Sequence, residues 1–231
     1  MAEARASHLR LVVSEPAPLT VRQPKLRFRP VVRLGDGAPF GMHVETDITF
    51  EDAFHPRLAA GATPPSVAGW LGDLIERAAR LAHDTETARP VSITAPMAAL
   101  ADSDAPMAAE AGVKRSSLLP QEVRIDFLDA SVVAMEDLAL DRIDAFRRRG
   151  FRIGLDARKS WRTPMGQRAR MTFEAVRLEP GRIEDLDVPM TRLEVAAADG
   201  VALIAENVRW RDAEKLAEQG IHFAMSPRAD G

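Results

Sequence analysis

One local pattern recurs along this 231-residue chain: a helical segment, a glycine, and then a short strand. The clearest copy has cations at Arg147–Arg149, then Gly150, then Phe151–Asp156 with alternating apolar side chains. Cations suit the negative end of a helix dipole, and glycine adopts the left-handed conformation that ends many helices. Alternation with a period of two is typical of a strand. The same order returns at Gly200 and Gly220, so we expect helices and strands to alternate along most of the chain.

Strands that alternate with helices at this spacing predict parallel pairing through right-handed crossovers. The expected strands cover residues 26–34, 38–46, 90–95, 122–128, 151–156, 173–178, 201–205 and 221–225, and the expected helices cover 66–83, 106–114, 132–149, 190–198 and 211–219. Gly35-Asp36-Gly37 joins the first two strands as a hairpin. We therefore predict an α/β fold, a TIM-like (β/α) barrel that opens with an N-terminal β-hairpin. An open doubly wound sheet is the alternative, although no GxGxxG motif follows any expected strand.

Composition sets the domain count and excludes several classes of protein. Residues 1–24 contain three prolines and no sustained helical face, which predicts a flexible tail, and residues 25–231 are expected to form one barrel domain. A net charge of -3 argues against a nucleic-acid binder, and the absence of cysteine excludes disulfides and thiolate metal sites. There is no apolar run long enough for a membrane span and no signal-peptide core, so we expect no membrane partner and a cytoplasmic location.

Three stretches carry a resemblance to a known family: FRPVV at Phe28–Val32, RRGFRIGLD at Arg148–Asp156, and VALIAENVRWRDAEKLAEQG at Val201–Gly220. In order and spacing the chain resembles, over about residues 26–228, the EAL domain, the bacterial phosphodiesterase module that cleaves cyclic di-GMP. The resemblance implies a TIM-like barrel whose active members hold two divalent cations with oxygen ligands. It also implies a lysine that helps to activate or position the attacking water.

Most of the family's functional positions carry other side chains in this chain. The replacements are His43 for the Glu of the naming motif, Thr94 for the Asn ligand, Phe127 for the next Glu, and Ala157 for the second Asp of the pair. Asp126 and Asp129 lie beside Phe127 as near misses. The resemblance retains Asp156 and Glu206, whereas Arg177 stands at the position of the lysine.

These replacements lead us to expect no phosphodiesterase activity. Two carboxylates cannot hold two hard cations against hydration, because oxygen-ligand sites need several converging oxygens. Arg177 cannot act as a base because its pKa lies far above neutral. We therefore expect no catalytic residue, no metal ligand and no cofactor. A salt-bridged role for Asp156 and Glu206, with Arg177 as partner, is the expected arrangement.

A basic segment follows Asp156, with five cations and no acid between Ala157 and Arg170. It could bind nucleotide phosphates at the barrel mouth, and Trp161 within it could stack on a guanine. The alternative is a solvated loop or a patch for an acidic partner. If a ligand is retained, its candidate contacts are Arg29, Asp156, Arg158, Arg162, Arg177 and Glu206.

Three functional hypotheses follow. The first is a catalytically inactive EAL-like domain that regulates motility, flagella or adhesion by binding an unidentified protein partner, the kind of role that the resemblance implies. The second is a receptor that binds cyclic di-GMP without cleaving it. The third is an active metal-dependent phosphodiesterase whose site is rebuilt from Glu45, Asp126 or Asp129. Homodimer formation stays open at this point.

Overall fold

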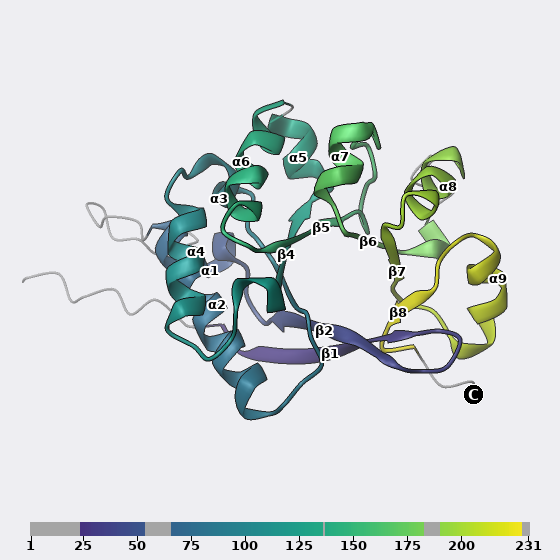
Figure 1. Ribbon diagram of the computed structural model, residues 1–231, viewed down its shortest axis with the longest axis horizontal. Helices are drawn as coiled ribbons and strands as arrows, with labels where there is room; N and C mark the ends of the chain where they lie inside the picture. Colours follow the sequence, from purple (N-terminus) through teal and green to yellow (C-terminus); the bar gives the residue numbers. More distant parts are fainter. Residues whose placement is uncertain (1–23, 54–65, 136, 183–189, 228–231) are drawn as a thin grey trace, which may run out of the picture.

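Eight strands close into a barrel in the computed structural model, which describes residues 24–53, 66–135, 137–182 and 190–227 (Figure 1). The strands are β1 Leu26–Arg33, β2 Pro39–Thr46, β3 Val91–Thr94, β4 Val123–Leu128, β5 Arg152–Asp156, β6 Ala175–Leu178, β7 Ala202–Ala205 and β8 Phe223–Met225. They follow one another around the barrel in sequence order. Parallel pairing runs from β2 to β8, whereas β1 is antiparallel to both of its neighbours. The predicted TIM-like barrel with an opening hairpin is confirmed.

Helices surround this barrel (Figure 1). They are α1 Phe50–Ala53, α2 Val67–Asp84, α3 Ala98–Ala101, α4 Ala105–Lys114, α5 Asp129–Met135, α6 Asp137–Arg147, α7 Gln167–Thr172, α8 Met190–Ala198 and α9 Ala213–Glu218. The glycines expected to end helices have the left-handed conformation that this role requires: the φ angles of Gly150, Gly200 and Gly220 are 91°, 73° and 78°. Most of the segment 132–149, expected as mainly one helix, lies in α5 and α6, and residue 136 between them is outside the described residues. The short helix α7 was not predicted.

The longest helix, α2, begins where the sequence predicts. The Ser66 side chain accepts a hydrogen bond from the backbone N–H of Gly69 at 3.3 Å, as an N-cap residue should. Its apolar face packs on the barrel and on α4, and two glycines bring these helices into backbone contact. A Cβ on Gly112 would lie 2.3 Å from the carbonyl oxygen of Gly72, so a larger residue there would force α2 and α4 apart.

The first strand, β1, pairs with β2 in the hairpin and with the last strand, β8, on its other side. β1 pairs with β2 from Leu26 opposite Thr46, and it pairs with β8 from Val31 opposite Met225. A register irregularity between Val31 and Val32 bends β1 where it passes from one partner to the other. β1 therefore completes the barrel by contacts with both strands.

Pro24 is the first residue that the structure describes. This residue is buried, and its carbonyl oxygen accepts a hydrogen bond from Arg77 Nη2 at 2.7 Å. The rest of the predicted tail, residues 1–23, lies outside the described residues. No helix in the described ranges is long and apolar enough to cross a bilayer.

Candidate functional site

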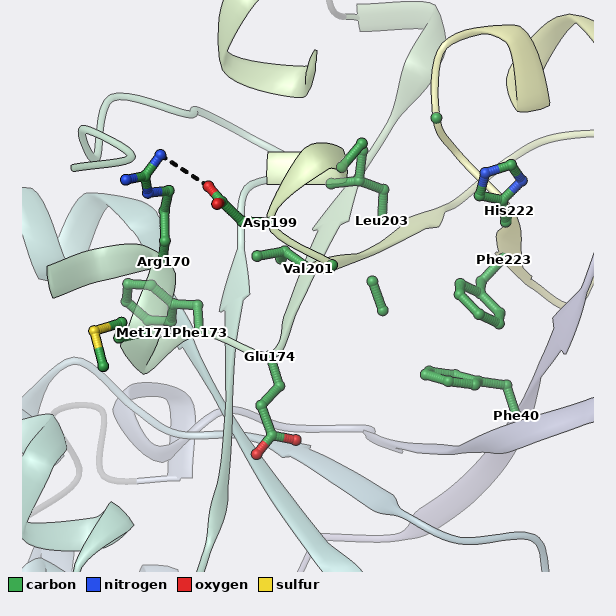
Figure 2. Close-up of a pocket in the computed structure, with 14 residues that line it drawn as sticks. Phe40, Arg170, Met171, Phe173, Glu174, Asp199, Val201, Leu203, His222 and Phe223 are labelled. Atoms are coloured by element: carbon green, nitrogen blue, oxygen red, sulfur yellow. Dashed lines mark ion pairs between the residues drawn. The ribbon is translucent and has the colours of Figure 1, made fainter. Parts of the chain in front are cut away.

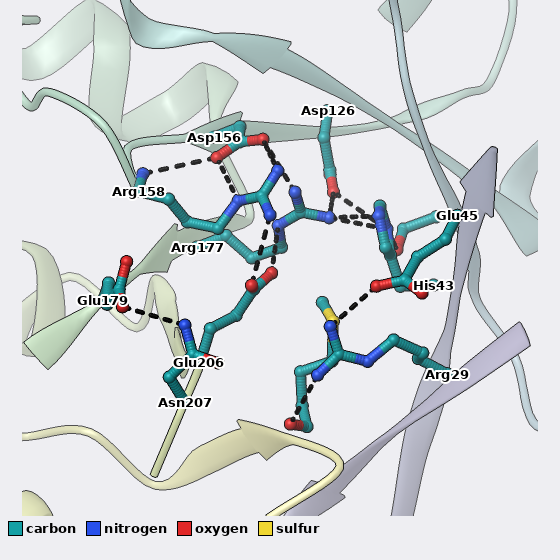
Figure 3. A network of polar contacts seen from close by, with 12 residues as sticks. Arg29, His43, Glu45, Asp126, Asp156, Arg158, Arg177, Glu179, Glu206 and Asn207 are labelled. Carbon is teal, nitrogen blue, oxygen red and sulfur yellow. Dashed lines mark hydrogen bonds and ion pairs between the residues drawn. The ribbon is translucent and has the colours of Figure 1, made fainter. Parts of the chain in front are cut away.

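Charged side chains converge inside the barrel at the C-terminal end of its parallel strands (Figure 3). This cluster, called here the arginine network, consists of His43, Arg124, Asp126, Asp156, Arg158, Arg177 and Glu206. Its members come from β2, β4, β5 and β6 and from the residues that directly follow β5 and β7. In (β/α) barrels this end of the strands is where binding and catalytic groups gather.

Arg177 lies at the centre of the network. Its side chain is only 1% exposed, and its Nη2 donates to Asp156 Oδ2 at 2.7 Å. Its Nε lies 3.4 Å from Glu206 Oε1, and its Nη1 lies 3.7 Å from Asp126 Oδ2. One guanidinium therefore faces three carboxylates from three different strands or strand ends.

Arg158 bridges two of the same carboxylates from the mouth of the barrel. Its Nη2 donates to Asp156 Oδ2 at 2.7 Å, and its Nη1 donates to Glu206 Oε2 at 3.2 Å. Burial by itself would raise the pKa of Asp156, but the hydrogen bond from Arg158 and the charge of Arg177 outweigh it and hold that pKa below its usual value. Burial by itself would lower the pKa of Arg158, but the hydrogen bonds and negative charges of Asp156 and Glu206 outweigh it and raise that pKa. Both groups are therefore charged at neutral pH.

A glycine makes room for the third ion pair of the network. Arg124 Nε donates to Asp126 Oδ1 at 2.8 Å, and both side chains are buried. The backbone of Gly154 on β5 lies directly against this pair. A Cβ on Gly154 would lie 2.1 Å from Asp126 Oδ1 and 3.1 Å from Arg124 Nε. Glycine is thus required at this position by close approach.

His43 is a neutral member of the network. Burial, followed by the charges of Arg177 and other arginines, lowers the pKa of His43 well below its ordinary value. Ser92 Oγ donates to the carbonyl oxygen of Met42 at 3.2 Å, so it is free to accept from His43 Nδ1 at 2.9 Å. Nε2 is then the nitrogen that accepts from Arg177 Nη1, an assignment made from this hydrogen-bond pattern. Both ring nitrogens of His43 therefore have a hydrogen-bond partner.

The network balances its own charge. Three guanidinium groups face three carboxylates, and the imidazole is neutral. The carboxylates that converge here already accept hydrogen bonds from arginines, and within the described residues no group of three or more His, Asp or Glu side chains is placed to share a metal ion. The arrangement does not fit a site for two divalent cations.

Comparison with solved structures identifies the type of barrel. No protein-family model matches the sequence, and neither does any curated protein. The solved structure of the phosphodiesterase PaMucR with c-di-GMP matches with a TM-score of 0.69 at 16% identity, over 88% of this chain and 94% of that one. The EAL domain of Mycobacterium smegmatis DcpA matches with a TM-score of 0.66 at 14% identity, over 87% and 89% of the two chains. The fold is that of an EAL domain. Klebsiella pneumoniae BlrP1, in its calcium and cyclic di-GMP complex, has the same fold with a TM-score of 0.65 at 14% identity, and the match covers 92% of this chain but 56% of BlrP1.

The EAL-type barrel brings together most of the residues that the sequence singled out. Asp156, Arg158, Arg177 and Glu206 are all in contact, and the expected pairing of Arg177 with both carboxylates is present. Arg29 lies near the network on β1, but its Nη1 donates to Glu45 at 2.7 Å (Figure 3). Glu45 therefore pairs with Arg29 and not with the metal-ligand positions.

Phe127 and the two near-miss carboxylates beside it take different places in the structure. Phe127, which was matched to a Glu ligand, packs against Phe146 with ring centroids 5.3 Å apart, on the helix side of β4. Asp126 is the residue that points into the barrel, because neighbours along a strand face opposite sides. Asp129 serves a different purpose, since its carboxylate accepts hydrogen bonds from residues 160, 162 and 163.

In the basic segment after β5, one interpretation of which was a phosphate-binding loop, three of the four arginines pair with acids. Trp161 is 2% exposed, so the proposal that it stacks on a guanine is wrong. Arg168 pairs with Asp141 and Asp144, and Arg170 pairs with Asp199 at 2.9 Å. Arg162 is exposed and lines a separate pocket, away from the network. Acids from other parts of the chain thus pair with Arg168 and Arg170 of this segment.

Another cavity, of about 540 Å³, opens at the opposite end of β6, β7 and β8 (Figure 2). Phe40 and Phe223 line it with ring centroids 4.0 Å apart, and the Arg170–Asp199 ion pair forms part of its wall. Glu174, also in the wall, lies 3.5 Å from Arg152. Because Arg170 and Asp199 are paired with each other, this ion pair leaves no free charge in the cavity wall to select a charged ligand.

Asp156 should make the fold sensitive to acid. Its lowered pKa means that its contribution to stability is complete above the pKa of an unfolded aspartate, about 3.9, and is lost as pH falls through the folded-state value. In urea unfolding, Asp156→Asn will therefore lose less stability than the parent as the pH falls below about 4. Asp84→Asn, on the exposed end of α2, is the control and should keep the parent slope. An unchanged slope in Asp156→Asn would contradict the assignment.

Proposed function

We propose that this chain is a cytoplasmic EAL-fold domain that does not hydrolyse cyclic di-GMP and that acts by binding a protein partner in bacterial signalling. Control of motility, flagella or adhesion is the proposed setting, as the resemblance to inactive members of the family implies. The observation that supports this proposal is the position of Arg177, whose guanidinium lies between Asp126, Asp156 and Glu206.

Two features of Arg177 argue against hydrolysis. A guanidinium and a divalent cation would compete for the same carboxylate oxygens, and the guanidinium is covalently part of the chain. Arginine stays protonated under any condition in which the protein is folded, so it cannot take a proton from water as a general base. Arg158 strengthens the argument because it occupies further oxygens of Asp156 and Glu206.

A receptor for cyclic di-GMP is the second candidate. PaMucR and BlrP1 share this fold and were solved with that ligand. The Arg158 side chain is 34% exposed at the mouth of the barrel, where it could turn toward a phosphate. It would then have to leave Asp156 and Glu206, and that loss of three charge-assisted hydrogen bonds weighs against tight binding.

The deciding experiment is calorimetric titration of the purified chain with cyclic di-GMP, with and without Mg²⁺ or Mn²⁺, together with chromatography of the nucleotide. We expect neither product nor binding heat. A Kd tighter than about 10 μM, roughly 7 kcal/mol, that weakens in Arg158→Gln would favour the receptor. Metal-dependent appearance of linear product would overturn the proposal.

Protein binding is then tested directly. The chain is used as bait in bacterial extracts, and each captured protein is purified and titrated against it. Sedimentation of the chain alone measures whether it forms a homodimer, the other assembly that the proposal leaves open. A monomer with no partner of micromolar affinity would argue against a protein-interaction role.

A further inference from the structure

We propose that the groove between α5, α6 and the segment 162–169 is a binding site for a small amphipathic carboxylate, a molecule with an apolar body and one carboxylate group. Figure 1 shows α5, α6 and α7 gathered side by side on one side of the barrel. The groove is lined by Val132, Val133, Leu140, Arg162, Thr163, Pro164, Gly166, Gln167, Arg168 and Ala169. It shares no residue with the arginine network and is independent of the function proposed above.

The size and lining of the groove suit a small molecule. Its volume is about 600 Å³, within the range of roughly 300–1,000 Å³ that is usual for such sites. Val132 and Val133 of α5 and Leu140 of α6 supply an apolar wall. Polar groups are few and come from the opposite side, from the segment that follows β5. A ligand with an apolar body and one polar end matches this division.

Arg162 supplies the charge. Its side chain is exposed, and within the described ranges it makes no ion pair. Arg168, the other cation of the groove, is already paired with Asp141 at 2.5 Å and with Asp144 at 3.5 Å. The groove therefore carries one uncompensated positive charge, which favours a monoanion. A guanidinium binds a carboxylate through two parallel hydrogen bonds, so a carboxylate is the matching head group.

Thr163 is the second, independent indication of a ligand. The residue is 3% exposed, it lines the groove, and its hydroxyl oxygen has no hydrogen-bond partner among the described residues. A buried hydroxyl without a partner destabilises the folded protein. A carboxylate oxygen held by Arg162 could accept a hydrogen bond from this hydroxyl and remove the cost.

The polar side of the groove is held in place by a buried acid. The Asp129 carboxylate accepts hydrogen bonds from the backbone N–H of Arg162 and of Thr163, each at 2.8 Å, and from Ser160 Oγ at 2.7 Å. Because Asp129 is 1% exposed, these bonds are shielded from water and fix the backbone at residues 160–163. The cation and the hydroxyl thus start from a preorganised backbone, which lowers the entropy cost of binding.

The test uses decanoate as the probe and decylammonium, with the same chain length and opposite charge, as its control. Calorimetry and thermal unfolding of the full chain should show saturable binding of decanoate and at least about tenfold weaker binding of decylammonium, or about 1.4 kcal/mol. Equal affinity for the two probes would show detergent-like binding and overturn the proposal.

Variants then locate the probe. Arg162→Gln should weaken decanoate binding about tenfold, whereas Lys159→Gln, which removes a charge from the same segment outside the groove, should change it less than twofold. Val133→Asn, at a partly exposed position on the apolar wall, should weaken binding without unfolding the chain. Equal losses in Arg162→Gln and Lys159→Gln would place the anion elsewhere.

Thr163→Val gives a result that a purely structural role would not. Without the probe, the variant should unfold at the same or a higher temperature than the parent, because a methyl group replaces a hydroxyl that has no partner. With the probe, its affinity should fall several-fold because the hydrogen bond to the carboxylate is lost. Undiminished decanoate affinity in Thr163→Val would show that the hydroxyl does not bind the carboxylate and would contradict the proposal.

Discussion

Arg177→Ala will lower the free energy of unfolding by about 3–5 kcal/mol. The change removes one of three cations from a buried cluster and leaves three carboxylates with two arginines. Asp126 and Asp156 both lose a contact, and neither can reach water to recover solvation. Urea unfolding at neutral pH measures the loss. The loss should shrink in mild acid, because the uncompensated carboxylate can then be protonated.

Two further variants make the result on Arg177 specific. Arg152→Ala removes an exposed arginine that lies 3.5 Å from Glu174, and it should cost less than about 1 kcal/mol. Arg177→Lys keeps the charge but loses the forked geometry, so its stability should fall between the parent and Arg177→Ala. If Arg177→Ala were as mild as Arg152→Ala, the central position of Arg177 would be wrong.

Gly154→Ala will cost about 2–4 kcal/mol, although it adds a single methyl group. The added Cβ would lie 2.1 Å from Asp126 Oδ1, so the carboxylate must move and break its 2.8 Å hydrogen bond with Arg124. Strand propensity favours alanine over glycine, which makes a loss of this size unexpected from the sequence alone. Thermal and urea unfolding measure it.

The control for Gly154 is Gly35→Ala in the hairpin turn, where no atom lies within 4 Å of the new Cβ. It should change stability by less than about 0.5 kcal/mol. A double variant gives a sharper test, because Asp126→Ala removes the atom that the Cβ meets. Gly154→Ala should then add little to the effect of Asp126→Ala, and full additivity would refute the steric explanation.

The barrel could be predicted from local signals because those signals agree with the fold. Alternating apolar residues mark β4 and β5, and Gly150 and Gly220 end the helices before their strands. The short helix α7 escaped prediction for the opposite reason. Its six residues show no apolar stripe and are held by the packing of Ala169 and Thr172.

The candidate site was predictable only in part. Pairing of Arg177 with Asp156 and Glu206 follows from charge and from the meeting of strand ends, and both pairs are present. The Arg124–Asp126 pair escaped notice because it depends on Gly154 in the neighbouring strand, and strand register cannot be read from one sequence. The acidic partners of Arg168 and Arg170 were missed because they lie on α6 and just after α8. How these elements pack against the basic segment cannot be read from one sequence.

The antiparallel pairing of β1 with β8 also bears on the order in which the chain can fold. Contacts across it, such as that between Ser226 N and Pro30 O, join residues 196 positions apart in the sequence. Pairing over so long a separation is slow, because a large loop must close before any contact rewards it. On the ribosome, β1 must wait for β8 to emerge, and until then β1 and β7 each present an unpaired edge. Exposed strand edges are sites of aggregation. The yield of soluble protein should therefore depend on how quickly residues 223–225 pair with β1 after they are synthesised.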